Sequence, residues 1–373
     1  MILLSAKNPV VRAFASVKIT MACLALLFVL TLWGTVAQVD QGLYLAQERY
    51  FFSWYFLAGG IVPFPGAQLV MWILFINLVC ASITRFVLKW SYTGIWITHV
   101  GLLLYFAAAY VTFQLTEESN LSLIPGETKN VSSAYHNWEL SFWRESESGK
   151  KSVTAVSEGA LRPGKTVTLP EGNISVLVKT YFRNASAYTA APEEQIMKAL
   201  NPSGIRLLEP KPFDIEPERN IPGGVFTVSA GGQNTDVLLY GAEGRPAEIA
   251  AGDQTLSVQL RRRRSPLPLL LTLNKFEKEF YPNTDTPKSF HSYLTVDHDG
   301  VKRDVEVYMN NPFRFKDYTF YQASYGVDEA GREFSTFAVV KNKRRLLPYI
   351  ASGVTFLGLT VHFMMMAFAR RKS

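Results

Sequence analysis

Residues 92–113 read YTGIWITHVGLLLYFAAAYVTF, a stretch that contains no Asp, Glu, Lys or Arg. A helix needs about 20 apolar residues to cross the hydrocarbon core of a bilayer, and this stretch is long enough. Three other stretches have the same character: 19–37, 69–88 and 346–369. Among them only the second contains a charge, Arg85, whose long side chain can reach the interface. The sequence therefore predicts four transmembrane helices.

The basic residues beside these stretches predict how the chain is oriented. They form three groups: Lys7, Arg12 and Lys18 before the first stretch, Arg85 and Lys89 between the second and third, and Arg370, Arg371 and Lys372 after the fourth. Cytoplasmic flanks of transmembrane helices are enriched in Lys and Arg. This rule places both ends of the chain, residues 1–18 and 370–373, in the cytoplasm. It places the segment 38–68 and the region 114–345 outside.

One basic group does not follow this rule. Lys341, Lys343, Arg344 and Arg345 lie outside, just before the fourth stretch. The sequence leaves two interpretations open. The group is either an interfacial anchor that binds lipid phosphates or a landing point for an anionic ligand at the outer membrane surface.

The external parts differ from one another in composition. The segment 38–68 is heavily aromatic and is expected to lie at the membrane interface. In the region 114–345, short β-like runs alternate with Gly, Pro and Asn, which predicts antiparallel sheets in a sandwich or open barrel. The arginine run at 261–264 is expected on a solvated edge strand or loop, with partner binding as the alternative. The predicted fold is thus an α-helical membrane part with a large β-rich extracytoplasmic domain.

Charge and cysteine content exclude several classes of protein. The net charge is +7, but the basic residues crowd next to apolar stretches, which favours lipid over nucleic acid. The two cysteines, Cys23 and Cys80, both lie inside apolar stretches, and the sequence has no Cys-x-x-Cys pair. This argues against thiol exchange, structural zinc and covalent attachment of haem to this chain.

Two of the five histidines, His99 and His362, fall inside predicted transmembrane helices. An ionisable residue there is costly and usually faces a partner, a cavity or a ligand. Each is seven positions from the cytoplasmic end of its stretch, so both are expected about 10 Å in, at the same level. Two level, neutral imidazoles in apolar surroundings suit axial ligation of a haem iron. His136, His291 and His298 lack metal-ligand spacing and are expected on the surface.

Helical phase adds an orientation to these histidines. Gly94, Gly101 and Ala108 share one face of their helix, and His99 points away from it. Faces of small residues let helices approach closely, so this face is expected to pack within the bundle, leaving His99 toward a ligand or a partner protein. The fourth stretch carries a stripe of its own: Ala351, Thr355, Gly358 and His362. That stripe either leaves room for a flat ligand or packs against a neighbouring helix.

Three passages resemble a known family. They are YTGIWITHVGLLL at 92–104, MNNPFRFKDYTFYQASY at 309–325 and GLTVHF at 358–363. In this order and topology they resemble the ResB-like (CcsB) family of cytochrome c biogenesis proteins, and the passage at 309–325 is the most specific. Gly34-Thr35 at the end of the first stretch and Pro65-Gly66 before the second fit the same family.

The resemblance implies a function. Members work with a ResC/CcsA-type membrane protein, move haem across the bacterial cytoplasmic membrane and join it to apocytochrome c outside (system II). This sequence has no Trp-x-Trp-Asp-like segment, so it resembles the unfused subunit, a non-autonomous part of a holocytochrome c synthase complex. The resemblance implies that haem b is bound transiently and non-covalently, with iron present only through haem. It makes His99 an axial-ligand candidate and His362 a second one, with the paired ligand able to come from the partner.

The passage at 309–325 is expected to form a β-hairpin that contacts the partner or client, or simply packs the fold. Its candidate residues are Asn310, Asn311, Pro312, Tyr318, Tyr321, Gln322 and Tyr325. A second function stays open beside haem handling. In it the chain is a non-haem membrane scaffold that docks the partner or apocytochrome c.

Overall fold

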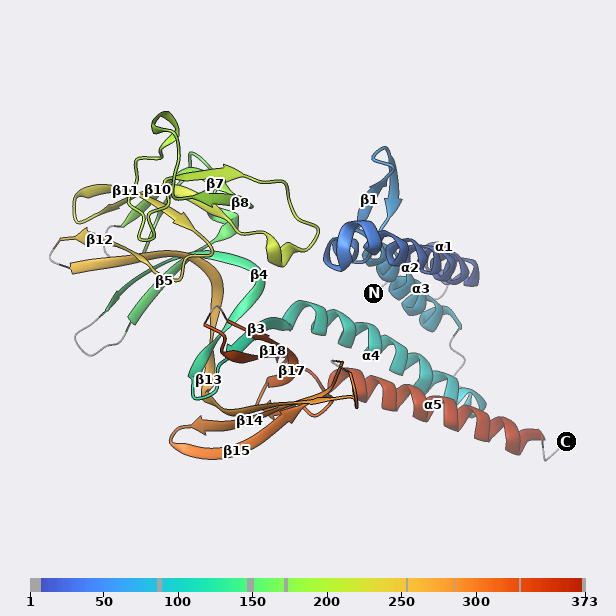
Figure 1. The fold of residues 1–373 in the computed structure, drawn as a ribbon. Coiled ribbons are helices and arrows are strands. Elements are labelled where there is room, and N and C mark those ends of the chain that lie inside the picture. The colour runs from blue at the N-terminus through green and yellow to red at the C-terminus, as the bar shows by residue number, and fades with distance from the viewer. Residues whose placement is uncertain are drawn as a thin grey trace. The chain divides into compact units, whose positions relative to one another are not determined.

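The computed structural model describes residues 8–85, 89–145, 151–170, 174–252, 254–284, 286–328 and 330–370 (Figure 1). The chain divides into two compact units. A helical unit comprises Met1–Glu117, Phe315–Tyr318 and Lys341–Ser373, and a β-rich unit comprises Glu118–Arg314 and Thr319–Val340. Each unit is described by itself.

The helical unit contains the predicted transmembrane helices. Its α-helices are α1 (Pro9–Phe14), α2 (Val17–Ala46), α3 (Ala67–Arg85), α4 (Thr93–Leu115) and α5 (Leu347–Arg370). Among the described residues, four helical stretches are long and apolar enough to cross a membrane: Val17–Phe51, Ala67–Thr84, Trp90–Leu115 and Leu347–Phe368. The prediction of four transmembrane helices is therefore confirmed.

Between α2 and α3 the chain forms a compact aromatic cap. A π-helix, η2 (Gln47–Phe51), is followed by a hairpin of β1 (Tyr55–Ala58) and β2 (Val62–Pro65). Tyr50 is buried, with its ring centroid 4.8 Å from that of Phe56 and 5.8 Å from that of Trp33 on α2. These edge-to-face and tilted contacts hold the hairpin against Trp33 on α2.

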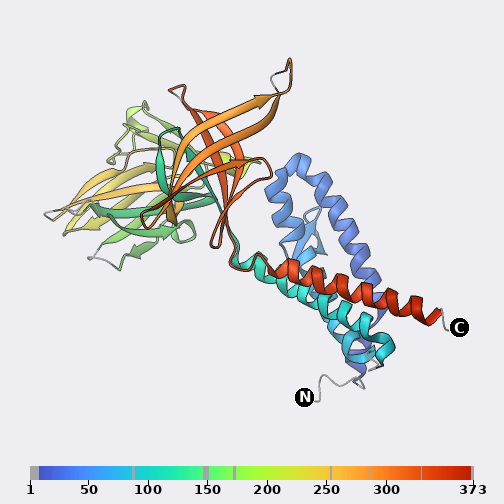
Figure 2. The same ribbon diagram turned by 90° about the horizontal axis from the view of Figure 1, so that it is seen from below.

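Helices α4 and α5 pack as a close antiparallel pair, and both views show them side by side (Figures 1 and 2). A Cβ atom added to Gly101 would lie 2.6 Å from the backbone nitrogen of Thr355, and one on Gly94 would lie 2.5 Å from Cα of His362. Gly358 faces Thr98 in the same way. Only glycine permits such an approach, because any side chain would overlap the facing backbone. The expectation that the Gly94–Gly101–Ala108 face packs within the bundle is confirmed, since all three residues are buried.

The β-rich unit is built on two very long strands, β4 (Thr128–Glu145) and β13 (Gln254–Phe280), which pair antiparallel. They belong to a ten-stranded sheet of order β15-β14-β13-β4-β3-β18-β17-β16, with β12 added to β13 and β5 to β4. The other members are β3 (Glu117–Leu123), β5 (Lys151–Ser157), β12 (Ala247–Ala251), β14 (Pro287–His298), β15 (Val301–Tyr308), β16 (Phe313–Phe315), β17 (Tyr318–Val327) and β18 (Glu333–Lys341).

A smaller four-stranded sheet covers one part of the large one. Its order is β11-β10-β7-β6, and its strands are β6 (Thr166–Thr168), β7 (Ser175–Phe182), β10 (Gly223–Ala230) and β11 (Gln233–Tyr240). A two-stranded sheet pairs β8 (Ala185–Tyr188) with β9 (Leu207–Pro210). The core between the sheets includes Phe142, Val178, Phe226 and Val258, all at most 2% exposed. The antiparallel, sandwich-like architecture matches the prediction.

The arginine run at 261–264 lies in the middle of β13, where the strand pairs with β4. Arg261 donates from Nε to Oε1 of Glu139 at 3.0 Å, and the two side chains are only 11% and 7% exposed. The Arg262 guanidinium lies 4.1 Å from the ring centroid of Trp138. Arg263 and Arg264 are exposed, as expected of a solvated run. The expectation is wrong for Arg261 and Arg262, because the buried Glu139 carboxylate pairs with the first and the face of Trp138 covers the second.

A buried polar cluster joins three strands of the large sheet. Ser292 on β14 donates to Oε1 of Gln322 on β17 at 2.7 Å, and Gln322 donates from Nε2 to Oγ of Ser335 on β18 at 2.9 Å. Ser292 and Ser335 are fully buried. Strands β14 and β17 are not neighbours in the sheet order, so this cluster requires the sheet to curl until they face each other.

The helix contact predicts a strong effect of added volume. Gly101→Leu would force α4 and α5 apart and should destabilise the protein by about 1–3 kcal/mol, as overpacking of a tight contact does. The effect is measured by heating the full chain in detergent and using size-exclusion chromatography to determine the folded fraction that remains at each temperature. Gly353→Leu is the matched control, since nothing lies within 4 Å of a Cβ at that position. Equal unfolding midpoints for the two variants would contradict the close packing.

The polar cluster predicts that Gln322 stabilises the fold. Gln322→Ala leaves buried hydroxyls with fewer partners, at a cost of about 1–3 kcal/mol. Tyr321→Ala is the control, because the neighbouring Tyr321 side chain is 42% exposed and its loss should cost far less. Protein yield and thermal midpoint should fall for the first variant only. Equal loss in both variants, or in neither, would show that the cluster is not a stabilising element.

Candidate functional site

His99 lies on α4 and lines a cavity of about 430 Å³ in the helical unit. The walls come from the α1–α2 junction, α2, α3 and α4, and are formed by Ala15, Val17, Thr20, Leu24, Leu74, Asn77, Leu78, Ala81, Ser82, Ile95, His99, Leu102 and Phe106. We call it the His99 cavity. It lies on the α2–α3 side of α4, whereas Gly94 and Gly101 contact α5. The helical-phase expectation that His99 points away from the glycine face is therefore confirmed.

The His99 ring is oriented by its own helix. Nδ1 lies 2.8 Å from the carbonyl oxygen of Ile95, one turn earlier. A carbonyl oxygen can only accept, so Nδ1 carries the proton and donates. In a neutral imidazole this leaves the lone pair on Nε2, which is the arrangement typical of a metal-ligating histidine.

Asn77 is a polar residue of this cavity that the sequence analysis did not single out. It is buried on α3, accepts a 2.7 Å hydrogen bond from Thr20 Oγ1, and donates to the carbonyl oxygens of Phe14 and Ser16 at 2.5 and 3.0 Å. It thereby ties α3 to the α1–α2 junction and holds one wall of the cavity. The signal was present, since an asparagine in the middle of an apolar stretch is costly unless its amide is satisfied.

His362 occupies a different position from His99. The facing pairs Gly94–His362, Thr98–Gly358 and Gly101–Thr355 place Leu357 beside His99. His362 is five residues farther along α5, an offset of about 7.5 Å between the backbone positions along the helix axis. The expectation that the two histidines lie at the same level is wrong for their backbone positions, because counting from the ends of two apolar stretches ignores the register that the glycine contacts impose.

The surroundings of His362 also differ. Its backbone packs against Gly94, its ring centroid is 5.6 Å from that of Phe363, and its Nδ1 is buried without a hydrogen-bond partner among the described residues. The described residues that line the His99 cavity do not include it. Of the two interpretations of the stripe with Thr355 and Gly358, helix packing is the one that the structure supports, since α4 fills the space.

A second, aromatic cavity of about 540 Å³ lies farther along α4. Its walls are formed by Leu27, Phe51, Phe52, Ala67, Gln68, Met71, Trp72, Phe75, Phe106, Ala107, Ala109, Tyr110 and Phe113. Phe106 belongs to both cavities, so its ring stands between them. Two apolar spaces therefore follow one another along the α3–α4 interface.

The residues of the passage at 309–325 have separate surroundings. Asn310 adopts a positive φ of 64° in a turn closed by a 3.0 Å hydrogen bond from Asn311 N to Tyr308 O, and Pro312 follows it. Strands β16 and β17 are hydrogen-bonded neighbours and form the expected hairpin. Gln322 lies in the buried cluster and Tyr325 packs on Phe290 at 4.9 Å.

Two tyrosines of that passage differ from these packed residues. The Lys341 ammonium lies over the Tyr318 ring, with Nζ 5.9 Å from the ring centroid. Tyr321 is exposed. Part of the passage therefore packs the fold, and Tyr321 and the Asn310 turn remain accessible.

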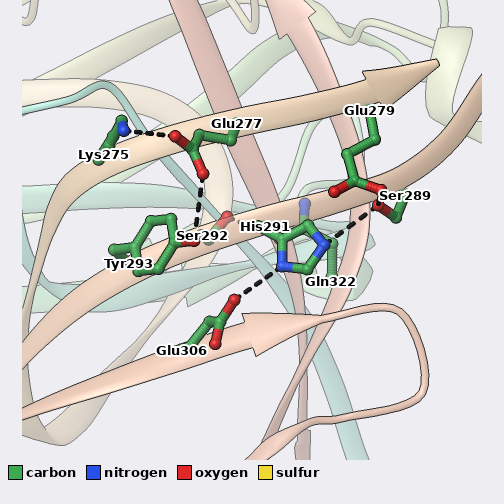
Figure 3. A network of polar contacts seen from close by, with 9 residues as sticks. All are labelled: Lys275, Glu277, Glu279, Ser289, His291, Ser292, Tyr293, Glu306 and Gln322. Atoms are coloured by element: carbon green, nitrogen blue, oxygen red, sulfur yellow. Dashed lines mark hydrogen bonds and ion pairs between the residues drawn. The ribbon is translucent and has the colours of Figure 1, made fainter.

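His291 is the centre of an exposed polar network on β13, β14 and β15 (Figure 3). Its Nδ1 lies 2.7 Å from Glu306 Oε1 and its Nε2 lies 3.1 Å from Ser289 Oγ, whose hydroxyl donates to Glu279 Oε2 at 3.1 Å. Nearby, the hydrogen bond from Tyr293 to Glu277 raises the pKa of the phenol. Within the part of the chain that the structure describes, no three His, Cys, Asp or Glu residues are arranged to hold a metal ion. The network stabilises cross-strand pairing, and Ser289, His291 and Tyr293 share one face because strand residues alternate.

Comparison with known proteins places the chain in a family. It is similar to Protein NrfI of Wolinella succinogenes, with 30% identity over 96 residues. That match covers 25% of this chain and only 10% of NrfI. The model of the ResB-like family matches residues 88–357, from before α4 to the middle of α5. Because this match spans well over half of the 373 residues, the chain belongs to the ResB-like family.

Proposed function

We propose that this protein is a membrane subunit for cytochrome c biogenesis that holds haem b transiently through His99. Membership of the ResB-like family supports a role in cytochrome c biogenesis in general. In the proposal, a ResC/CcsA-type partner receives the haem and the complex attaches it to apocytochrome c outside the cytoplasm. The chain alone performs no ligation.

The observation that carries the proposal is the combination of His99 with its cavity. Nδ1 is bonded to Ile95 O, so the lone pair of the neutral ring is on Nε2, the nitrogen that would ligate iron. The other cavity walls are mostly aliphatic and suit the apolar face of a porphyrin. Haem is the cargo here, and these residues fit it by donor chemistry and by polarity.

His362 is a second ligand candidate with a different requirement. Its offset from His99 and its packing against α4 speak against the two imidazoles of one chain clasping a single haem. The second axial ligand of a haem at His99 would instead come from the partner. His362 could serve iron only by facing that partner, and its Nδ1, which has no hydrogen-bond partner among the described residues, leaves its tautomer open to such an assignment.

The aromatic cavity extends this proposal along the membrane. It begins where the His99 cavity ends, at Phe106, and lies near the ends of α3 and α4 that lead to external segments in the proposed orientation. Large aromatic side chains offer stacking surfaces to a planar macrocycle. A haem that leaves His99 would thus find a second apolar site before it reaches the surface.

The orientation is part of the same proposal. The basic residues Lys7, Arg12 and Lys18 near the first apolar stretch, and Lys89 between the second and third, favour a cytoplasmic location for both termini of the chain. The β-rich unit would then be extracytoplasmic, in the compartment where cytochrome c is assembled. The membrane would be the bacterial cytoplasmic membrane.

The alternative is a scaffold that docks the partner or apocytochrome c and never touches haem. The exposed Tyr321 and Asn310 turn are the observations that favour it, because they offer an accessible surface. The two functions differ in one property that can be measured, namely haem bound to the isolated complex.

Substitution of His99 separates them. His99→Ala should lower the haem recovered with the complex at least about tenfold, since loss of merely an outer-shell partner of a ligand costs 10–100-fold. Added imidazole should restore part of the haem, because the vacated space admits a free ligand of the same chemistry. His99→Gln keeps a hydrogen-bonding side chain but is a poor iron ligand, and should fail as alanine does. The Soret absorbance per mole of purified complex is the measurement.

His298→Gln is the matched control, since that histidine lies in the β-rich unit with Nδ1 on Pro268 O at 2.7 Å. It should leave the haem content unchanged. Full haem content in the His99→Gln variant, with no response to imidazole, would favour the scaffold. His362→Gln, measured in parallel, reports on the second candidate separately.

A further inference from the structure

The start of α5 carries a basic surface whose cations are used in two different ways. Lys341 is paired with Glu117 at 3.3 Å and lies over the ring of Tyr318, while Arg345 donates from Nη1 to the carbonyl oxygen of Lys316 at 3.3 Å. These two side chains fasten the segment to its surroundings within the helical unit.

Lys343 and Arg344 are held differently. A hydrogen bond from Asn342 N to Asp317 O at 2.8 Å, and one from Arg344 N to Asn342 Oδ1 at 2.9 Å, fix their backbone in a tight turn. Both side chains are exposed, and among the described residues no carboxylate lies within 4.0 Å of either. The fold therefore presents two uncompensated cations at a fixed place.

The neighbouring charges do not cancel them. The turn brings together five basic residues with two acidic ones, and of the acidic pair Glu117 is already bound to Lys341: Lys316, Lys341, Lys343, Arg344 and Arg345 against Glu117 and Asp317. The N-terminal end of α5 adds the positive pole of its helix dipole at the same point. The site thus favours an anion.

The next residues identify the kind of anion. Leu346, Tyr349 and Ile350 are 63%, 74% and 55% exposed, and α5 is one of the helices apolar enough to cross a membrane. Immediately beside the cations, the same helix therefore offers apolar contact for acyl chains and a tyrosine of the kind found at membrane interfaces. A soluble acidic protein would complement the charges but not these side chains.

We propose that Lys343 and Arg344 form a binding site for the phosphate of an anionic phospholipid, whose acyl chains lie along the first turns of α5. The site anchors α5 where the chain passes from β18 into the membrane. This inference depends on the membrane-spanning helices and not on haem binding by His99.

The test uses the full chain in nanodiscs of phosphatidylcholine with a minority of spin-labelled phosphatidylglycerol. Electron paramagnetic resonance measures the immobilised fraction of label. Each basic residue near a lipid phosphate contributes about a fivefold preference, so Lys343→Gln with Arg344→Gln should weaken the preference for phosphatidylglycerol by about 30-fold. Lys343→Arg with Arg344→Lys keeps both charges and should retain it.

The control variant Lys302→Gln with Arg303→Gln removes an equal charge from the exposed edge strand β15. It should leave the preference for phosphatidylglycerol unchanged. Equal immobilisation of labelled phosphatidylcholine and phosphatidylglycerol by the wild-type chain would overturn the proposal. An unchanged preference for phosphatidylglycerol in the Lys343/Arg344 glutamine variant would overturn it as well. Soluble glycerophosphoglycerol should not compete, and full competition by it would mean a site for free anions and not for lipid.

Discussion

The close antiparallel contact between α4 and α5 determines most of what this membrane part can do. At Gly94, Gly101 and Gly358 the two backbones approach so closely that no side chain fits between them. The contact fixes the relative register of the two helices and fills the space beside the Thr355–Gly358 stripe. The same two helices also connect the membrane part to the rest of the chain: the chain leaves it after Leu115, at the end of α4, and returns at Leu347, at the start of α5.

The position of His99 follows from this contact. With one face of α4 committed to α5, the opposite face must meet α2 and α3, and there the structure has the His99 cavity. Asn77 stabilises the facing wall, because its side-chain amide forms hydrogen bonds with α1, with α2 and with the segment between them. Ile95 orients the ring and Asn77 holds the cavity wall, and both residues belong to the helical unit.

Parts of this arrangement could be predicted from the sequence and parts could not. Apolar length gave the four spans, and the spacing of Gly94 and Gly101 gave the direction of His99, because both are local properties of one helix. The level of His362 depends on contacts between two helices more than 250 residues apart in the chain. The contacts of Arg261 with Glu139 and of Arg262 with Trp138 likewise depend on a strand pairing between segments far apart in the sequence. The hydrogen bonds of Gln322 to two other strands could not be predicted either, because they depend on how distant strands are brought together.

The proposed haem binding requires an imidazole of this chain to ligate the iron. It can be tested on the wild-type complex by labelling only this subunit with ¹⁵N-histidine and recording pulsed electron paramagnetic resonance of the ferric haem. We expect a ¹⁵N hyperfine coupling from one ring nitrogen, and we expect it to disappear in the His99→Gln subunit. A haem-loaded complex without any ¹⁵N coupling, or with the coupling intact after that substitution, would contradict it.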